Sequence, residues 1–185
     1  MTEARGSRLT VEDWINAGYA ILAEEGIKGL KLEPLCARVD ATKGSFYWHF
    51  SGMEGYRQAL VQAWGEVRDA DRSHFAGLRS LPPRERLSQM MAALVDARHW
   101  RLERAMREWA RTDDAVAAGV RASDARVVDA VRQAFVDDGF DSEDADVRAN
   151  ATFAAGIGFL HLSGSRPSAA AAARRERFLD IMLTH

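Results

Sequence analysis

Several residue types are scarce in this sequence, and each shortage excludes a class of protein. Among its 185 residues there is one cysteine, Cys36. A single thiol cannot build an internal disulfide framework, so we expect a reducing compartment. No apolar run reaches the roughly 18–20 residues that a membrane span needs, and the N-terminus has no apolar stretch of the signal-peptide type. These absences together predict a cytoplasmic protein.

Proline and strand signals are also scarce. There are four prolines, and no short alternating run of apolar and polar residues is bounded by an Asn-Gly or Asp-Gly turn, so hairpins are not expected. Alanine, arginine, leucine and glutamate dominate, and all four favour helix. The sequence therefore predicts an all-α fold of about nine helices. The expected helices cover residues 11–25, 32–39, 43–49, 53–77, 84–97, 101–111, 114–137, 142–163 and 168–183.

Charge is nearly balanced overall but unevenly distributed. The formal net charge is −2, which argues against a generally basic protein that coats nucleic acid.

Residues 149–162 carry no formal charge, and a helix that is apolar on several sides has to be covered on several sides. We expect this helix and the apolar segment at 178–183 to pack against the same helices of a second chain, as in a four-helix bundle.

Residues 32–50 contain two short predicted helices joined by a turn of about three residues. Neither helix can bury its apolar face alone. Leu35, Cys36 and Val39 form one apolar face, and Phe46 and Phe50, four residues apart, form the other. Packed together beneath the first helix, they form a small three-helix unit. This is the helix-turn-helix arrangement.

The outward side of the second of these helices is suited to DNA. Lys43 and Gly44 lie at its start, where backbone N–H groups and the helix dipole attract anions. Tyr47 follows one turn later on the same face, and His49 lies near the helix end, within reach of a phosphate. A helix led by lysine with an aromatic hydroxyl behind it suits a major groove. The residues expected to contact DNA are Thr42, Lys43, Gly44, Tyr47, Trp48 and His49.

The same run resembles a family motif. The DNA-binding domain of the TetR family of bacterial repressors has the hallmark Gly-Val-Ser-x-Gly-x-Leu-Tyr-x-His-Phe. Residues 40–50 here read Asp-Ala-Thr-Lys-Gly-Ser-Phe-Tyr-Trp-His-Phe, so the Gly-x-x-Tyr-x-His-Phe spacing is kept. The resemblance extends over residues 10–56, and beyond them only the length and the helix layout are similar.

Four positions depart from the family pattern. Asp40 stands at the usual turn glycine, and aspartate can adopt the left-handed conformation at some cost. Cys36 replaces a small alanine, and Lys31 stands where a serine or threonine often caps the second helix. Met53 stands where a lysine often contacts phosphate. Its presence removes one contact and should slightly flatten the salt dependence of DNA binding.

The resemblance implies a homodimeric, ligand-responsive transcriptional regulator that acts as a repressor, is not an enzyme and needs no cofactor. Residues 1–52 would form the DNA-binding domain, and residues 53–185 a helical domain for dimerisation and effector binding. The effector would be a small molecule. The double-stranded DNA partner would be a palindromic operator, because a two-fold dimer presents two reading heads about one helical turn of DNA apart.

The C-terminal part offers candidate residues for both roles. Aromatic and methionine side chains line apolar pockets, but they also fill ordinary cores, and both interpretations stay open. The candidate pocket residues are Trp64, Met90, Trp100, Met106, Trp109 and Phe135. The candidate dimer-interface residues are Phe153, Ile157, Leu160, Phe178 and Met182.

Two other functions remain as alternatives. Asp71 with His74, and Asp96 with His99, form two Asp-x-x-His pairs on separate predicted helices. Di-iron bundles use two Glu-x-x-His pairs with further inward glutamates, whereas the acids here are shorter and arginines flank them. Such a metal enzyme would purify with stoichiometric iron or manganese. A helical module that binds only proteins would leave the lysine and tyrosine of the predicted DNA-reading helix without a role.

Overall fold

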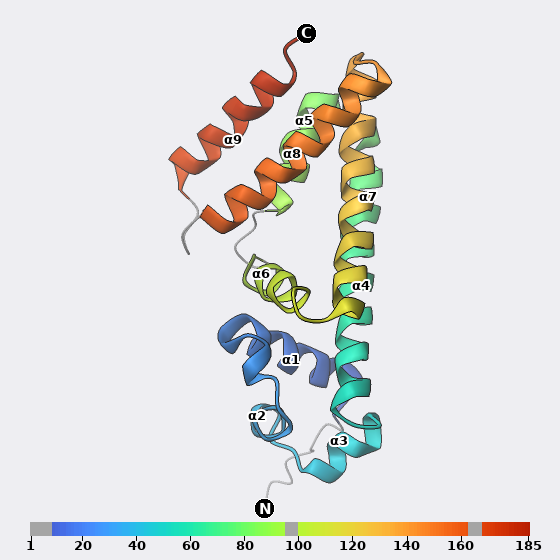
Figure 1. Cartoon of the computed structure of the whole chain (residues 1–185), viewed down its shortest axis with the longest axis vertical. Coiled ribbons are helices and arrows are strands. Elements are labelled where there is room, and N and C mark those ends of the chain that lie inside the picture. Colours follow the sequence, from blue (N-terminus) through green and yellow to red (C-terminus); the bar gives the residue numbers. More distant parts are fainter. Residues whose placement is uncertain (1–8, 95–99, 163–167) are drawn as a thin grey trace, which may run out of the picture. The chain divides into compact units, whose positions relative to one another are not determined.

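The computed structural model describes residues 9–94, 100–162 and 168–185, and the side chains of these residues apart from 67–76 and 160. Every regular element within these ranges is helical, which confirms the predicted all-α fold (Figure 1). The chain divides into two compact units, Met1–Trp64 and Gly65–His185. The helices are α1 (Val11–Glu25), η1 (Ile27–Gly29), α2 (Leu32–Arg38), α3 (Lys43–His49), α4 (Met53–Gly77), η2 (Leu78–Ser80), α5 (Pro83–Leu94), α6 (Trp100–Trp109), α7 (Asp114–Asp138), α8 (Ser142–Leu162) and α9 (Ala169–Met182).

The first unit begins with a capped helix. Thr10 Oγ1 accepts a hydrogen bond from the Asp13 backbone N–H at 3.2 Å, and the Asp13 carboxylate accepts one from the Thr10 backbone N–H at 2.8 Å. This reciprocal capping box satisfies two donors at the start of α1, and the bonds from Thr10 lower the pKa of the Asp13 carboxyl. α1 ends at Gly26, whose φ of 69° suits a glycine stop. Both ends of α1 were predicted from the sequence.

An aromatic core holds α1, α3 and the start of α4 together. Trp14, Phe46 and Tyr56 are completely buried. The Phe46 ring meets Trp14 and Tyr56 edge-on, at centroid distances of 5.4 and 5.5 Å. The Tyr56 hydroxyl donates to the Trp14 carbonyl at 2.7 Å. Because a helix of seven residues is marginal in isolation, we infer that this core stabilises α3.

In the second unit, α7 packs extensively on α8, and α5 contacts both (Figure 1). The buried face of α8 consists of small side chains at a spacing of three and four residues: Ala145, Ala149, Thr152 and Gly156. A Cβ added at Gly156 would lie 2.5 Å from Leu94 Cδ2. The small residues therefore let α5 lie close against α8.

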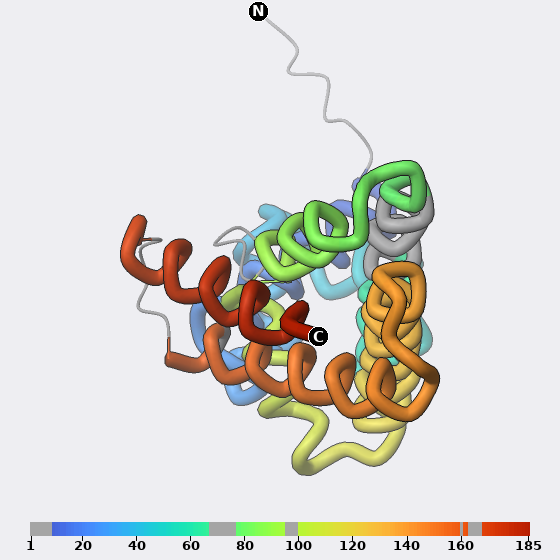
Figure 2. Tube along the Cα trace, turned by 90° about the horizontal axis from the view of Figure 1, so that it is seen from above, coloured from blue at the N-terminus to red at the C-terminus, as the bar shows by residue number. Residues whose placement is uncertain are grey.

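α9 lies alongside α5 and α8, as both views show (Figures 1 and 2). Its Leu179 is completely buried in the apolar core. Arg84 of α5 donates to Glu176 at 2.6 Å and to Asp180 at 2.8 Å, and the Ser88 hydroxyl also donates to Glu176, at 2.7 Å. Both apolar packing and a polar cluster thus attach α9 to α5.

The helix boundaries lie within one or two residues of the predicted ones wherever the structure describes them. The turns η1 and η2 were not predicted, because three residues are too few to show a hydrophobic period. Leu81 and Pro82 separate η2 from α5, and Pro83 is the first residue of α5. Within the described ranges, no helix has the length and apolarity to cross a membrane.

Candidate functional site

α3 presents two large aromatic side chains to solvent. Tyr47 and Trp48 are 59% and 67% exposed, whereas the neighbouring Phe46 is completely buried and anchors the helix. Thr42 begins α3 through its hydroxyl, which accepts from the Ser45 backbone N–H at 3.2 Å. An adjacent pair of exposed aromatic residues on a firmly anchored helix is a surface suited to a partner.

The backbone at the start of α3 is open to close approach. A Cβ added at Gly44 would meet only the Thr42 hydroxyl oxygen, at 3.6 Å. Asp40, in the turn before α3, has φ of 51°. This confirms that the aspartate adopts the left-handed conformation at the turn position where the family pattern has glycine.

His49 has a mixed environment. It is half-buried, and its ring centroid lies 6.5 Å from that of Trp14 and 4.8 Å from that of Trp48. The imidazole therefore packs against the ring of the exposed Trp48, and it also offers a polar group at the end of α3.

Lys43 is paired with an acidic residue that the sequence analysis did not single out. Its Nζ donates to Glu33 Oε1 at 2.6 Å, across the turn between α2 and α3. This hydrogen bond raises the pKa of Lys43 and lowers the pKa of Glu33. The two residues are ten positions apart, so their contact becomes visible only when the turn is folded.

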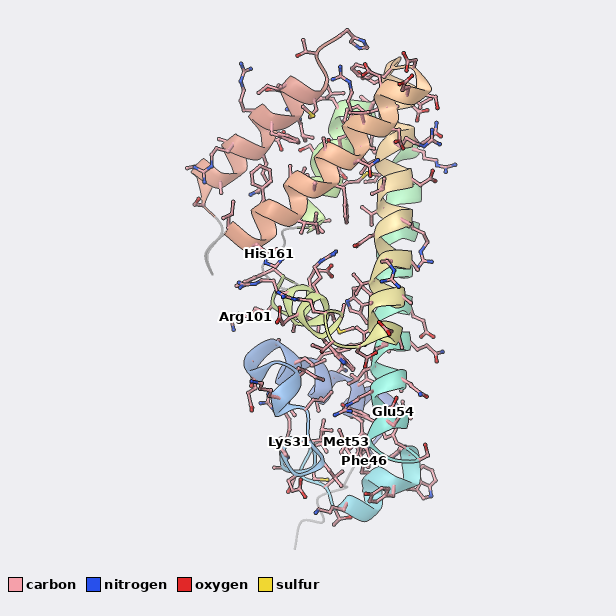
Figure 3. All side chains as sticks on the ribbon, viewed as in Figure 1. Lys31, Phe46, Met53, Glu54, Arg101 and His161 are labelled. Atoms are coloured by element: carbon pink, nitrogen blue, oxygen red, sulfur yellow. The ribbon has the colours of Figure 1, made fainter. Side chains whose placement is uncertain are left out.

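Two departures from the family pattern lie at helix starts (Figure 3). Lys31 precedes α2 as its N-cap and provides no side-chain hydrogen bond to it. Met53 is the first residue of α4. Neither position has the side chain that the family pattern uses there, as expected from the sequence.

The second unit contains a small apolar cavity between α5, α7 and α8. Its free volume is about 20 Å³, close to the roughly 10–15 Å³ that one water molecule requires. Thr152 is the polar member of the lining and is 3% exposed, and within the described part of the chain its hydroxyl has no hydrogen-bond partner. The lining residues are Leu87, Met90, Met91, Leu94, Val127, Val131, Thr152 and Phe153.

The structure does not gather the predicted pocket residues around this cavity. Met90 is the member of that set that lines it. Phe135 is buried in the same apolar core as Met90 but does not line the cavity. Met106 and Trp109 are buried as well, and neither of them lines it.

The two remaining predicted pocket residues also lie away from the cavity lining. Trp64 ends the first unit, and Trp100 begins α6, with the Arg104 guanidinium 5.1 Å from its ring centroid. Thr152 was not identified as a lining residue from the sequence. The feature that could have pointed to it is a single hydroxyl among small residues, at a helical spacing, in a helix segment without charge.

A buried charge cluster borders one wall of the cavity. Arg107 donates to Glu103 at 2.8 Å and to Asp124 at 2.7 and 2.9 Å. Its guanidinium lies 5.9 Å from the ring centroid of Phe153, a lining residue. Burial opposes the charge on Arg107, but the hydrogen bonds and charges of Asp124 and Glu103 raise its pKa. Arg107 therefore holds α6 to α7 through the Asp124 carboxylate, while Glu103 pairs with it within α6.

The predicted dimer-interface residues are half-buried within the single chain where the structure describes them. These are Phe153, Ile157, Phe178 and Met182, and the side chain of Leu160 lies outside the described set. Phe178 of α9 packs edge-on against Phe159 of α8, with ring centroids 6.1 Å apart. These side chains thus contribute to packing within the unit.

The opposite face of α8 is exposed and apolar. Val147 and Leu162 are 63% and 86% exposed, and Ala151 and Ala154 between them are also exposed. A Cβ added at Gly158, on the same face, would meet nothing within 4 Å. Five positions at a spacing of three or four residues thus form an outward stripe of apolar and small residues, which we call the α8 stripe.

The alternative metal site falls outside the described side chains. Asp71 and His74 lie in the part of α4 whose side chains are not described, and Asp96 and His99 lie between the described ranges 9–94 and 100–162. Among the described side chains, no group of three or more potential metal ligands is present.

One family model matches the region that contains these features. Residues 15–60 match "Bacterial regulatory proteins, tetR family". This segment includes α2, α3 and the exposed aromatic pair. No curated protein matches the chain by sequence.

Solved structures match the fold of nearly the whole chain. A transcriptional regulator from Rhodococcus sp. Rha1 has 19% sequence identity and a TM-score of 0.77, covering 95% of this chain and 94% of the other. GusR from Salmonella enterica has 20% identity and a TM-score of 0.73, with 96% and 99% covered. A TetR-like transcriptional regulator from Rhodococcus sp. RHA1 has 18% identity and a TM-score of 0.73, with 98% and 96% covered. At these identities the likeness establishes the fold.

Proposed function

We propose that the protein is a DNA-binding transcriptional regulator rather than an enzyme, since residues 15–60 match the TetR-family model and the fold matches that of known regulators. We further propose that it is a cytoplasmic, homodimeric repressor, and that a small molecule causes it to release a palindromic operator. Residues 1–52 would read DNA, and residues 53–185 would dimerise and bind the effector. The observation that carries the proposal is the exposed Tyr47–Trp48 pair on an anchored α3 beside the open Gly44.

The DNA contact would use the outward side of α3 in the major groove. Lys43 is a donor for phosphate or for guanine O6 and N7. Tyr47 and Trp48 offer a hydroxyl, an indole N–H and apolar surface for base edges and sugars. The absence of a side chain at Gly44 lets the helix start approach the backbone of the duplex. These four residues from two consecutive turns form one compact reading surface.

Substitutions on α3 test this assignment. Binding to a duplex enriched from a random pool would be measured by fluorescence anisotropy for Tyr47→Ala and Lys43→Ala. We expect losses of roughly 5- to 150-fold for each, since a good base contact is worth about 1–3 kcal/mol. Val11→Ala, at an exposed site on α1, is the matched control and should bind normally. Unchanged affinity in both α3 variants would contradict the proposed reading surface.

Homodimerisation is supported by the α8 stripe. Exposed apolar residues arranged along one helix face mark protein interfaces, and alanine and glycine allow two helices to approach closely. Residues 149–162 carry no formal charge, so pairing this segment with its copy would bury no unpaired ion. The symmetric pair would place two α3 helices on a two-fold operator.

The effector cavity indicates the chemistry of the ligand. Seven of its eight lining residues are apolar and none is charged, so a charged group there would lose its hydration without compensation. Among the residues that the structure describes, the Thr152 hydroxyl has no partner, so it can donate one hydrogen bond to a ligand or accept one. We infer an uncharged, mainly apolar effector with one hydroxyl or carbonyl group.

Binding such a molecule would require the cavity to widen. A volume of about 20 Å³ is far smaller than the roughly 150 Å³ cavity that accepts benzene in an engineered protein. Met90 and Met91 supply flexible lining side chains. An effector would therefore select a conformer in which α5, α7 and α8 are spaced differently, and α4, whose residues belong to both units, would transmit the change.

Calorimetry with p-cresol, toluene and benzoate tests the ligand class. We expect p-cresol to bind most tightly and benzoate not to bind. Thr152→Val should weaken p-cresol roughly three- to tenfold through loss of one hydrogen bond and leave toluene unchanged, whereas Thr152→Ser should retain p-cresol. Saturating p-cresol should also lower operator affinity. If p-cresol bound without any change in operator affinity, the regulatory role of the cavity would be contradicted by linkage.

A further inference from the structure

The proposed DNA-binding part of the chain has little positive charge for a segment that binds phosphates. Residues 1–60 contain seven lysines and arginines and eight acidic residues. Two of these cations, Arg38 of α2 and Lys43 of α3, are moreover bound to glutamates of the same chain. The chain's own carboxylates thus occupy part of the positive charge near the reading surface.

The two ion pairs differ in kind. Arg38 binds Glu24 through two hydrogen bonds, of 3.0 and 2.5 Å, and ties α2 to α1. Lys43 binds Glu33 through a single hydrogen bond of 2.6 Å, and the two side chains are 58% and 68% exposed. An exposed pair of this kind shifts an equilibrium by about one- to fivefold. The pair can therefore form in the free protein and open when a stronger partner arrives.

We propose that Glu33 is an internal competitor of DNA for Lys43. Binding a duplex exchanges the Lys43–Glu33 contact for a contact between Lys43 and a phosphate or a guanine edge. The proposal rests on the proposed role of Lys43 in DNA contact. It assigns to Glu33 a function in setting DNA affinity that needs no contact between Glu33 and DNA.

The exchange has two physical consequences. Every complex in which Lys43 contacts DNA must first break the pair, so affinity is reduced by the strength of the pair. The released carboxylate is then left near the phosphates of the duplex, and it partly cancels the charge that Lys43 delivers. Since each neutralised phosphate adds about 0.9 to the slope of log affinity against log salt, the exchange reduces the contribution of Lys43 to that slope.

Substitutions that remove the charge of one of two glutamates separate competition for Lys43 from the effect of net charge on DNA affinity. Glu33→Gln and Glu12→Gln make the same change in net charge, and Glu12 is exposed on α1, outside the two helices that form the pair. Each variant is made alone and together with Lys43→Gln. Affinity for the enriched duplex and for a scrambled duplex is measured by fluorescence anisotropy between 50 and 200 mM salt, conditions over which salt dependence is readily resolved.

We expect Glu33→Gln to tighten binding two- to fivefold more than Glu12→Gln, on both duplexes, and to steepen the salt slope by up to about one unit. In the Lys43→Gln background the difference between the two glutamate substitutions should shrink, because only the repulsion between the Glu33 carboxylate and the phosphates remains. Equal effects with Lys43 present would overturn the proposal and leave the pair a structural contact. Weaker operator binding by Glu33→Gln would also overturn it, because Glu33 would then read a base itself, as a carboxylate can at cytosine N4.

The proposed DNA-reading role of α3 is tested separately within the same set. Lys43→Gln alone should weaken binding to both duplexes. If it does so while the two glutamate variants behave alike, α3 keeps its role and only the competition is wrong. If Lys43→Gln leaves affinity unchanged, the assignment of Lys43 as a DNA contact fails. Thermal melting of each variant checks that the chain is folded.

Discussion

At the scale of single residues, Gly18 and Tyr56 lie close together in the core of the first unit. A Cβ added at Gly18 would lie 2.1 Å from the Tyr56 hydroxyl oxygen. That hydroxyl donates to the Trp14 carbonyl, and burial raises the pKa of Tyr56 well above its ordinary value. The glycine therefore makes room for a buried hydrogen bond between α1 and α4.

Gly18→Ala should destabilise the protein by about 1–3 kcal/mol, since extra volume in a filled core forces neighbouring groups apart. Tyr56→Phe alone should cost about 1 kcal/mol for the lost hydrogen bond. The double variant should lose less stability than the sum of the two single losses, because removing the Tyr56 hydroxyl also removes its clash with the Cβ added at residue 18. Urea unfolding followed by circular dichroism measures these differences.

Gly65→Ala is the matched control for that experiment. Gly65 also lies in a helix, and a Cβ added there would meet nothing within 4 Å. The substitution should leave stability unchanged or raise it by up to about 1 kcal/mol through helix propensity. Strictly additive costs for Gly18→Ala and Tyr56→Phe would contradict the described contact.

Residue-level features could be predicted where their cause is local in the sequence. The Thr10 cap follows from residues within one turn, and the left-handed Asp40 was expected from the family pattern; the structure confirms both. The Lys43–Glu33 pair and the place of Thr152 in the cavity lining depend on chain segments that meet only after folding. Spacing along the sequence carries no signal for such contacts.

At the scale of elements, the Arg84 cluster that joins α5 to α9 is sensitive to acid. Hydrogen bonds from Arg84 and Ser88 lower the pKa of Glu176 below its ordinary value of 4.5. The folded state therefore favours the ionised carboxylate more than the unfolded state does. This contribution to the free energy of unfolding is fully present above the pKa that Glu176 has in the unfolded state. It is lost as the pH falls through the lower pKa that Glu176 has in the folded state.

Glu176→Gln should lower the free energy of unfolding at neutral pH by no more than about 1 kcal/mol, because the pair is partly exposed and screened by solvent. The difference from the parent protein should shrink below pH 4.5, where the parent loses the same charge. Urea unfolding at pH 7, 5 and 3.5 measures it, with Glu143→Gln, at an exposed site on α8, as control. A difference that grew in acid would contradict the assigned sign.

The positions of the helices could be predicted from the sequence, but which side of α8 is buried could not. Hydrophobic period and stop residues gave the boundaries to within about two residues. Residues 149–162 lack charge on every side, so no polar face marks the outside of that segment. The structure turns the small residues Ala145, Ala149, Thr152 and Gly156 inward. The predicted interface residues Phe153 and Ile157 are half-buried beside them.

At the scale of the whole molecule, the α8 stripe predicts how the proposed dimer can be broken. Ala154→Arg would place a charge in the middle of the stripe, where burial against a second copy would leave it unpaired. We expect a shift from dimer to monomer in sedimentation velocity and a loss of operator affinity. Ala122→Arg, at an exposed position of α7, is the control and should remain dimeric. A dimer that tolerated Ala154→Arg would place the interface elsewhere.

If two copies of α3 read a two-fold DNA site, duplexes that the protein selects from a random pool must carry that symmetry. Sequencing of the enriched pool should give an inverted repeat whose half-sites are centred about one helical turn apart or slightly more, with two chains bound per duplex. Enrichment of a single unrepeated site, or no enrichment above a scrambled pool, would contradict two-fold reading by α3.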